Sequence, residues 1–518
     1  MRAELSTLEG RSFDVAVIGA GINGCSAARE LSAAGYTVLL VDKGDFAAAS
    51  SSRSTRLVHC GLRYFAPGGS PWSFLWHPAD LARALRMTRQ AMAARSEFVR
   101  DASERTRVFT FGFPVYRGMA YKSWQVDLAL RMVEALGPKD VPLDRHVLKP
   151  AEIAKTPLYR DLRDQDQLVA INTYREYQFD WAERVGMDMV IDAERMGALA
   201  RNYTPVVGLE RGGGEGWALT LADAMGETGE ARVSAKLVLN TAGIWIDRVN
   251  ALASETAGRK ILGTKGAHIV IRLPEECRDH GVIGFNREGE EPVYLVPWRQ
   301  GLHYMGVTET VYEGDIDDIH ATDEDIDWLI AEANHLVPSL GLARADVLYT
   351  WAGVRPLTYD PNVPKGVRSR EIHDLAKDGM SGALAMTAGP VTTHRSAGRE
   401  LLAAVRRKLQ PSGSPQAPDY APHLFPGAES SPALLNHYAD ITLADLRHAA
   451  EHEQTATLVD LLCRRTGVGW TETMAREGAQ KAAETVADIM CWDEARIEAE
   501  VAAFHAHLDH FHRRPSEI

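Results

Sequence analysis

The stretch from Phe13 to Asp42, FDVAVIGAGINGCSAARELSAAGYTVLLVD, contains two apolar segments on either side of an alanine-rich one. Residues 13–18 are rich in Val and Ile and predict a buried strand, and residues 37–41 predict a second strand. Residues 23–34 between them have the pattern of a helix, which Gly35 ends. The stretch therefore predicts a strand–turn–helix–strand unit of an α/β protein.

Three glycines between the first strand and the helix have the spacing G-x-G-x-x-G. Gly19 permits a tight turn, Gly21 lets the backbone approach a pyrophosphate, and Gly24 lets the helix pack close to the strand. The helix N-terminus presents N–H groups and a positive dipole end to the phosphates. Asp42 ends the second strand and can accept hydrogen bonds from a ribose hydroxyl. We therefore predict a dinucleotide-binding unit.

The bulk composition is that of an ordinary globular protein. The chain has 518 residues, so we expect two or three domains. A hydrophobic content of 45% and a charged content of 25% are typical of globular proteins. The net charge of −13 argues against nucleic acid as a partner, whereas contact of a local patch with a membrane stays open.

The cysteines have no paired spacing, which argues against a disulfide framework and against a zinc site; we therefore predict no metal and a reducing compartment. They are Cys25, Cys60, Cys277, Cys463 and Cys491. No apolar run reaches the ~18 residues that span a bilayer, and the N-terminus does not resemble a signal peptide. We expect a cytoplasmic protein, or one bound to the inner face of the cytoplasmic membrane.

The segment after Asp42, KGDFAAASSSRSTRLVHCGLRYF, is rich in hydroxyl residues and carries three arginines. Ser51 and Ser52 can donate hydrogen bonds to phosphate or flavin. Arg63 and Tyr64 can hold an anionic substrate, because a guanidinium fork suits phosphate or carboxylate. The alternative is a surface loop with solvated arginines.

A Pro/Gly loop at residues 66–78 carries four large apolar side chains, and a long helix is predicted over residues 79–101. Exposed aromatic residues beside arginines can enter a membrane interface. The same residues can equally fill a gap in the core or cover an active site. They are Trp72, Phe74, Leu75 and Trp76.

The rest of the chain predicts three parts. Residues 1–408 interleave the nucleotide-binding unit with an antiparallel sheet, placed roughly at residues 108–235 and 264–350, that would hold the substrate. A Pro/Ser-rich linker follows at residues 409–433. From residue 434 to 518 the apolar residues have helical periodicity, which predicts a separate all-α domain.

Several motifs together resemble the FAD-dependent, aerobic-type glycerol-3-phosphate dehydrogenase family. They are GAGINGCSAARE, SSRSTRLVHCGLRYF, NTAGIWID, TKGAHIV, VPWRQGLHYMGVTET, WAGVRPL and TTHR, in the family's order and approximate spacing. The tail, with HEQTATLVDLLCRRTGVG, resembles the family's C-terminal domain. The resemblance covers nearly the whole chain. It implies a Rossmann-type, glutathione-reductase-like FAD domain, an antiparallel-sheet substrate domain and an all-α C-terminal domain.

The resemblance also implies an activity. The secondary hydroxyl of glycerol 3-phosphate, or of a related polyol phosphate, would be oxidised to the ketone by hydride transfer to flavin N5. Electrons would pass to a quinone at the membrane, to which the protein would attach peripherally. Oxygen as the acceptor, a homodimer and the mode of FAD attachment stay open.

Site residues follow from the same resemblance. His268 would lie beside the flavin as base or hydroxyl ligand, although a structural histidine is the alternative. Arg355 would be the main anion contact, with Arg63, Tyr64 and Arg370 also at the substrate. The remaining cofactor contacts would be Gly19, Gly21, Gly24, Asp42, Ser51, Ser52, Gly243, Trp245, Gly353, Gly389, Thr392 and Thr393.

The sequence departs from the family pattern in the last of these segments. Family members usually read G-G-K-x-T-T-Y-R, whereas residues 388–395 read AGPVTTHR, so Pro390 replaces a lysine. A charge-assisted hydrogen bond contributes about 1.5–3 kcal/mol, roughly tenfold to a hundredfold in binding. The substrate could therefore be glycerol 3-phosphate, another polyol phosphate, or an unphosphorylated polyol or hydroxy acid. A flavin-dependent oxidase and a flavin-binding protein without this catalysis are the alternative functions.

Overall fold

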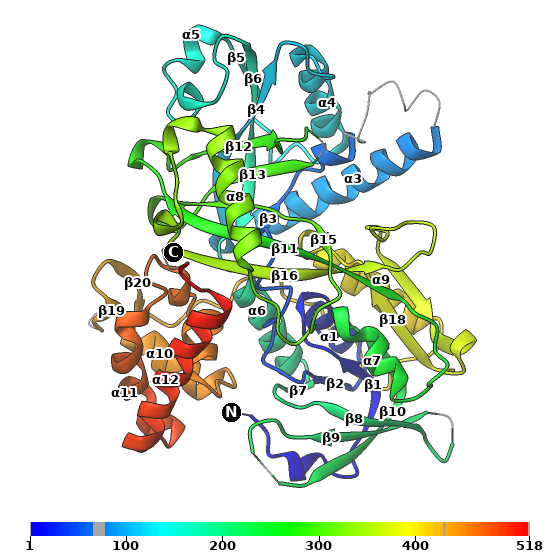
Figure 1. Ribbon diagram of the computed structural model, residues 1–518. Coiled ribbons are helices and arrows are strands. Elements are labelled where there is room, and N and C mark those ends of the chain that lie inside the picture. Colours follow the sequence, from blue (N-terminus) through cyan, green and yellow to red (C-terminus); the bar gives the residue numbers. More distant parts are fainter. Residues whose placement is uncertain are drawn as a thin grey trace.

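The computed structural model describes residues 2–65, 78–214, 216–226, 228–289, 291–427 and 431–515. Within these residues the chain forms two large sheets and a mainly helical C-terminal part (Figure 1). The aromatic loop expected at residues 66–78 lies outside the described residues, except for Pro78, which begins α3 (Pro78–Asp101).

The first sheet is built on the predicted Gly-rich unit. Its main strands follow the order β17-β18-β10-β1-β2-β7, and the strands from β18 to β7 pair in parallel. Helix α1 (Ile22–Ala33) contacts both α6 (Ala182–Arg195) and α9 (His394–Arg406). The strands are β1 (Ser12–Ile18), β2 (Val38–Val41), β7 (Leu199–Arg201), β10 (Glu230–Asn240), β17 (Glu371–Asp374) and β18 (Ala383–Thr387).

The predicted strand–turn–helix–strand unit is confirmed. Every residue of β1 after Ser12 is buried, as the Val- and Ile-rich pattern indicates. Gly35 ends the helix with φ +90°, a conformation that costs glycine little. A Cβ on Gly24 would lie 2.7 Å from Thr241 Oγ1, so only glycine lets α1 approach the sheet so closely.

The second sheet follows the order β15-β11-β14-β13-β12-β4-β6-β3, with β16 on β11 and β5 on β6. The long strands β11 and β16 pair antiparallel, which places His268 opposite Trp351 and Thr264 opposite Arg355. The strands are β3 (Leu57–Val58), β4 (Thr106–Tyr116), β5 (His146–Leu148), β6 (Leu168–Phe179), β11 (Ile261–Arg272), β12 (His280–Phe285), β13 (Pro292–Pro297), β14 (Leu302–Gly306), β15 (Thr310–Val311) and β16 (Tyr349–Thr358).

The membership of this second sheet differs from the sequence expectation. Residues 199–235, which were expected to belong to it, form strands of the first sheet instead. The reason is that β10 pairs in parallel with β1, and the hairpin of β8 (Val206–Arg211) and β9 (Trp217–Ala222) extends β10 outward. The second sheet also continues past residue 350, because β16 runs to Thr358.

Helices pack against the second sheet. Helix α8 (Asp323–Leu336) contacts β11, and α4 (Ser123–Leu136) contacts β6 and α3. The N-terminus of α8 is capped by Thr322, whose hydroxyl accepts from the backbone N–H of Asp325. The shorter helices are α5 (Pro150–Ile153) and α7 (Ile246–Ala251).

The C-terminal part, residues 433–515, is here called the cap. It is mainly helical, as predicted, but it opens with a short hairpin of β19 (Ala433–Leu435) and β20 (Tyr438–Thr442). Its helices are α10 (Leu443–His452), α11 (Ala479–Met490) and α12 (Glu494–Phe511), with a π-helical turn at Asp460–Arg465. The Pro/Ser-rich segment before the cap lies against the first sheet's helix, since Gln416 N–H donates to Ala33 O.

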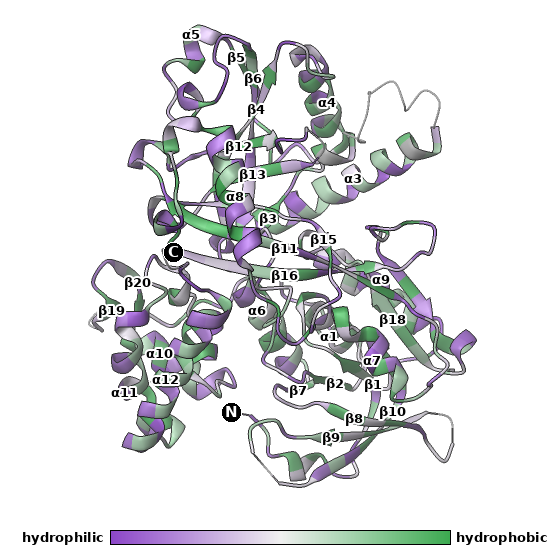
Figure 2. Cartoon of the chain, viewed as in Figure 1, coloured by the Kyte–Doolittle hydropathy of each residue, from purple (hydrophilic) through white to green (hydrophobic). Residues whose placement is uncertain are grey.

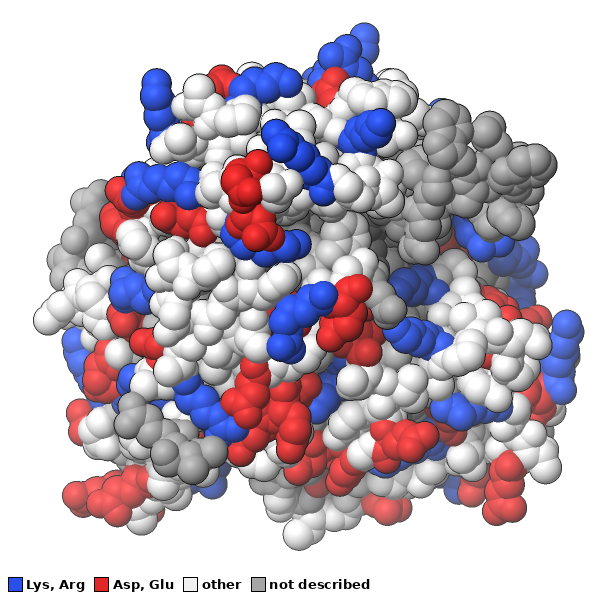
Figure 3. Space-filling view, turned by 45° about the horizontal axis from the view of Figure 1, so that its top comes forward, with Lys and Arg blue, Asp and Glu red and all other residues white. Residues whose placement is uncertain are grey.

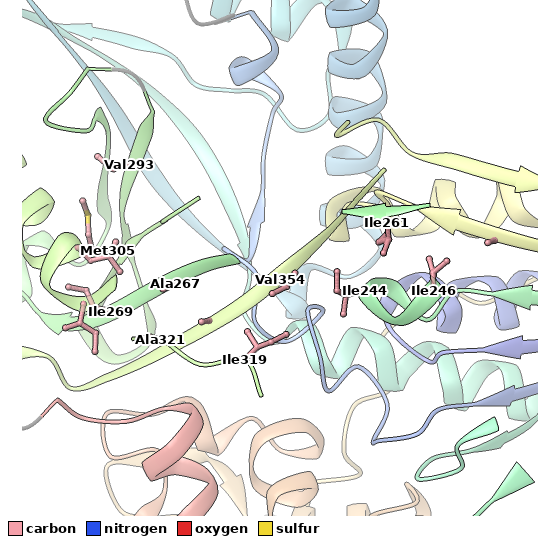
Figure 4. Close-up of a cluster of buried hydrophobic side chains, with 14 of the residues drawn as sticks. Ile244, Ile246, Ile261, Ala267, Ile269, Val293, Met305, Ile319, Ala321 and Val354 are labelled. Atoms are coloured by element: carbon pink, nitrogen blue, oxygen red, sulfur yellow. The ribbon is translucent and has the colours of Figure 1, made fainter. Parts of the chain in front are cut away.

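One buried hydrophobic cluster joins the two sheets. It includes Phe13 and Ile18 of β1 as well as Ile269 of β11. Figure 4 shows side chains of this cluster from the segment Ile244–Ile246, from β11 and β16, and from the loop at Ile319 and Ala321. Figure 2 shows that hydrophobic residues follow β11 and the strands of the first sheet. Because the core is shared, the space between the sheets has fixed walls.

The surface carries both signs of charge. On the face in Figure 3, Lys and Arg side chains are interspersed with Asp and Glu side chains.

Among the described residues, no helix is both long enough and apolar enough to cross a bilayer.

Buried ion pairs hold the cap to the first sheet. Arg184 of α6 donates to Glu453 Oε2 at 2.6 Å and to Asp188 Oδ1 at 3.0 Å. Asp45 accepts from Arg464 at 2.6 Å and from Arg465 at 2.7 Å. Burial alone would raise the pKa of Asp45, but the two guanidinium groups hold it well below its usual value.

Replacement of Arg184 by Leu should destabilise cap docking by about 3–5 kcal/mol, because it leaves the buried Glu453 carboxylate without its partner. The exposed pair Arg447–Asp488 provides the control, and Arg447→Leu should cost less than about 1 kcal/mol. Urea unfolding followed by tryptophan fluorescence measures both. Equal losses in the two variants would contradict the account.

Candidate functional site

A central cavity of about 1200 Å³ lies between the two sheets. Its walls include the Gly-rich turn after β1 at one end and residues of β11 and β16 at the other. The carboxyl ends of parallel strands commonly border the ligand crevice in such sheets. One elongated ligand could therefore contact both sheets.

The Gly-rich end is fixed by local hydrogen bonds. Gly19 has φ +100°, and a Cβ there would lie 2.6 Å from Ala242 Cα. Asp42 Oδ2 accepts from Ala20 N–H at 2.6 Å and Oδ1 from Gly44 N–H at 2.9 Å, while burial raises the Asp42 pKa. Asp42 thus shapes the turn in addition to lining the cavity.

The start of α1 is also prepared for a polar ligand. Ser51 Oγ accepts from Ile22 N–H at 2.9 Å and lines the cavity. A Cβ on Gly21 would approach this Oγ to 3.3 Å, so glycine keeps the turn open. The helix's N-cap residue, Gly21, has no side chain to occupy the helix N-terminus.

Trp245 forms part of the wall after β10. Its indole N–H donates to Asp317 Oδ1 at 2.7 Å, and Lys43 Nζ lies 4.3 Å from its ring centroid. Asp317 also accepts from Arg248 at 2.7 Å. These contacts connect the segment after β2 to the loop before α8 along the cavity wall.

His268 is the buried histidine of the cavity wall. Its ring stacks on Trp351 with centroids 4.7 Å apart, and Nε2 lies 3.1 Å from Thr55 Oγ1. A Cβ on Gly306 would come within 2.8 Å of Nε2, so glycine is needed beside the ring. Burial, then the charges of Arg355 and Arg56, hold the His268 pKa well below its usual value. The imidazole is therefore neutral at neutral pH.

Arg355 lies on β16 and lines the same cavity. Its guanidinium packs on Gly266 of β11, where a Cβ would lie 2.9 Å from Arg355 Cζ. The neighbouring Gly353 also lines the cavity and lets the Arg53 backbone pass, since a Cβ there would be 2.8 Å from Arg53 O. Gly266 thus makes room for the Arg355 guanidinium, and Gly353 makes room for the Arg53 backbone.

Most predicted site residues meet at this cavity. Those on its wall are Gly19, Gly21, Asp42, Ser51, Tyr64, Gly243, Trp245, His268, Gly353, Arg355, Gly389 and Thr392. Arg63 lies in the 3-10 turn Leu62–Phe65, but its side chain is outside the described part of the structure. Gly24 serves helix packing instead, as described above.

Three predicted residues, Ser52, Arg370 and Thr393, do not reach the cavity wall. Ser52 Oγ donates to the carbonyls of Ala48 and Ala49 at 3.1 and 2.9 Å. Arg370 donates to Glu400 Oε2 at 2.9 Å and to Thr393 Oγ1 at 3.1 Å. These bonds direct the Arg370 guanidinium to the first turns of α9, which differs from its expected place at the substrate.

Sequence reasoning missed several wall residues. Thr55 contacts His268, yet it stood unremarked in the hydroxyl-rich segment. Arg368, two residues before Arg370, lines the cavity and forms an ion pair with Glu309, which also lines it. The aromatic residues Phe111, Tyr174 and Tyr294 close one side. Strand pairing over long separations brings them together, and local periodicity carries no signal of that.

Pro390, at the position of the family lysine, does lie on the wall. Its loop is held between α1 and β16, because Asn23 Nδ2 donates to Gly389 O and Ala388 N–H donates to Pro356 O, each at 2.8 Å. Proline offers no donor at this place in the wall.

The fold and the site define a dinucleotide-binding oxidoreductase with a second sheet over the reactive end. The model of the FAD-dependent oxidoreductase family matches residues 14–401, and that of the C-terminal domain of alpha-glycerophosphate oxidase matches residues 421–497. The chain belongs to this FAD-dependent family, and it is an oxidoreductase of the glycerol-3-phosphate dehydrogenase type. The Gly-rich turn, Asp42 and the continuous cavity fit FAD as the cofactor.

Curated relatives are similar over most of their length. A glycerol-3-phosphate dehydrogenase of Synechocystis sp. is 28% identical, covering 97% of each chain. An aerobic glycerol-3-phosphate dehydrogenase of Bacillus subtilis is 27% identical, covering 79% of this chain and 69% of its own. A D-erythritol 1-phosphate dehydrogenase of Brucella abortus is 30% identical, covering 75% and 72%.

Solved structures share the fold. The glycerol-3-phosphate dehydrogenase of Bacillus halodurans complexed with FAD superposes with a TM-score of 0.73 at 21% identity, covering 98% of this chain and 96% of its own. The L-alpha-glycerophosphate oxidase of Mycoplasma pneumoniae with FAD gives 0.57 at 18% identity, covering 81% and 100%. The predicted fold class is thereby confirmed.

Replacement of Gly19 by Ala should remove bound FAD from the purified protein. Both this variant and the control Gly118→Ala place alanine at positive φ, which costs about 1–3 kcal/mol of local strain. Only at Gly19 does the added Cβ meet backbone, at 2.6 Å, whereas Gly118 has open space. Flavin absorbance per protein and the FAD dissociation constant measure the difference. Unchanged FAD content in Gly19→Ala would contradict the assignment.

Proposed function

We propose that this protein oxidises the secondary hydroxyl of glycerol 3-phosphate, or of a closely related polyol phosphate, to the ketone. One observation carries the proposal: a neutral buried histidine and an arginine share a cavity with a dinucleotide-binding turn. The histidine suits proton transfer from an alcohol, and the arginine suits an anionic end group.

His268 would accept the hydroxyl proton at Nε2, the nitrogen that now contacts Thr55 Oγ1. Its low pKa keeps it in the accepting form, while the negative charge of a bound phosphate would offset Arg355 and favour the protonated form. Stacking on Trp351 and the close approach of Gly306 fix the ring. Bound FAD supplies the acceptor for the hydride that leaves the substrate carbon.

Arg355 would bind the phosphate and orient the substrate against His268. Arg368 is a second cation of the wall, although Glu309 already neutralises it. Pro390 adds no charge. The substrate anion would therefore meet fewer cations than the resemblance implies, which supports a site adapted to a related polyol phosphate. The erythritol-phosphate enzyme among the relatives supports the same class.

A quinone is the acceptor that we propose, with peripheral contact at the inner face of the cytoplasmic membrane. Helix α4 supports this contact, because Trp124, Leu128 and Met132 recur every four residues and are 59%, 49% and 38% exposed. The alternative is an oxidase that passes electrons to oxygen.

We also propose that the chain divides into residues 1–408, a linker at residues 409–433 and a domain at residues 434–518. A homodimer is proposed as well.

Anaerobic addition of glycerol 3-phosphate should bleach the flavin absorbance of the purified protein, because the substrate reduces the cofactor. A panel of tetritol and pentitol phosphates, each with its unphosphorylated form as control, ranks the substrates. Bleaching by phosphorylated forms alone supports the proposal. Bleaching by the unphosphorylated forms at rates equal to those of the phosphates would overturn it. Absence of bleaching with every compound of the panel would overturn it as well.

Pro390→Lys is the matched variant for this panel. A restored cation should tighten binding of the preferred phosphate by roughly tenfold to a hundredfold if the phosphate lies beside residue 390. An unchanged KM would place the phosphate elsewhere in the cavity.

Reoxidation by a soluble quinone, compared with peroxide formation in air, separates the dehydrogenase from the oxidase.

The pH profile of flavin reduction tests the pairing of His268 with Arg355. A neighbouring cation disfavours the imidazolium, so Arg355→Met should raise the His268 pKa toward its ordinary value of 6.5. The acid limb of kcat/KM should then move to higher pH, whereas the control Arg355→Lys keeps the charge and should leave the limb low. Since the same substrate serves both variants, its own phosphate titration cancels in the comparison. Coincident limbs would mean that His268 is not the titrating base.

A further inference from the structure

A cluster of metal-ligating side chains lies where the cap meets the second sheet's loops. Asp318 and His320 come from the loop before α8, and His510 comes from the last turn of α12. His510 Nε2 is hydrogen-bonded to Asp318 Oδ1, and His320 Nδ1 lies 3.4 Å from the same oxygen. The three donor atoms all lie within 4.8 Å of one another. Segments 190 residues apart in the chain thus converge on one point.

We propose that Asp318, His320 and His510 bind a divalent transition-metal ion of the Zn²⁺ type. Two imidazoles and one carboxylate suit zinc, nickel or copper, whereas Mg²⁺ and Ca²⁺ prefer oxygen ligands. Zinc bonds of about 2.0–2.2 Å place tetrahedral donors roughly 3.3 Å apart. The distances between the donor atoms of the cluster lie on both sides of this value and reach at most 4.8 Å. Side-chain rotations alone would therefore complete the site. Solvent would supply the fourth ligand, because His510 and Asp318 are both about half exposed.

The backbone on each side of the cluster is already held in place. Asp318 N–H donates to Asp315 O at 3.1 Å, and its carbonyl accepts from Tyr312 at 3.3 Å. On the cap side, His512 Nδ1 lies 3.0 Å from Thr350 O, and Arg513 forms an ion pair with Asp323. A preorganised pair of segments lowers the entropic cost of gathering the ligands.

The ion would act beside the central cavity. Ile319 and Phe511, each adjacent in sequence to a ligand, line that cavity. Arg53 joins them, because its Nη1 donates to Ile319 O at 2.9 Å and its guanidinium lies 4.6 Å from the Phe511 ring. In Figure 1 the last described residues, which follow α12, lie beside the start of β16, where His512 contacts Thr350. A bound ion would therefore fasten the cap to the loop that forms part of the cavity wall.

The test is titration of tag-free, chelator-treated protein with Zn²⁺ by isothermal calorimetry. One site per chain is expected, and His510→Gln or Asp318→Asn should weaken it by at least about 100-fold, because loss of a supporting partner alone costs 10–100-fold. His452→Gln is the control, since His452 is exposed beside Glu451 but outside the cluster. Equal binding by the control and the cluster variants would overturn the proposal.

Two further measurements keep the outcome clear. Co²⁺ should give the visible absorption of a low-symmetry nitrogen–oxygen site in the parent protein and in His452→Gln, and not in His510→Gln. Zn²⁺ should raise the melting temperature of the parent and slow its release of FAD, whereas the cluster variants should show neither change although they fold. A thermal shift that persists in His510→Gln, or Mg²⁺ binding as tight as Zn²⁺ binding, would contradict the assignment.

Discussion

The structure depends on the close approach of the Gly-rich turn to the segment after β10. Thr241 Oγ1 donates to Gly19 O at 2.8 Å and to Ile18 O at 3.2 Å, so a residue from the middle of the chain closes a turn made near its start. No side chain can stand between them, because a Cβ on Gly19 or Gly24 would meet Ala242 or Thr241. The parallel pairing of β1 with β10, the entry of α1 and the floor of the cavity all follow from this contact.

The reactive end rests on a different constraint, the burial of charge. His268 is buried and lies near the half-buried Arg355, so a second positive charge on the imidazole would be costly. The protein resolves this by keeping the imidazole neutral and the guanidinium charged. In the proposed reaction, the neutral imidazole would accept a proton and the neighbouring guanidinium would bind the anion. The two roles are set by environment, as in other sites where neighbouring groups have displaced pKa values.

Local patterns predicted the elements better than their partners. The Gly-rich unit and α3 follow directly from local periodicity and glycine positions, because these signals lie within a few residues. Sheet membership of residues 199–235 did not follow, since β8, β9 and β10 alternate like strands of either sheet and only pairing with β1 decides. Among site residues, Arg370 shows the same limit: the resemblance places it at the substrate, but Glu400 and Thr393 determine where its guanidinium points. Glycines such as Gly266 and Gly306 gained meaning only when the neighbouring strand was known.

The position of Phe511 in the cavity wall has a consequence for the order of events during synthesis. The cavity is otherwise built from residues 18 to 392, and N-terminal parts of a chain generally fold first as it emerges from the ribosome. The parts of the wall that precede the cap can therefore assemble before Phe511, in the last turn of α12, joins them. FAD can then enter the partly built pocket while the cap is being translated. Phe511 completes the wall of the pocket only when the end of α12 has been made.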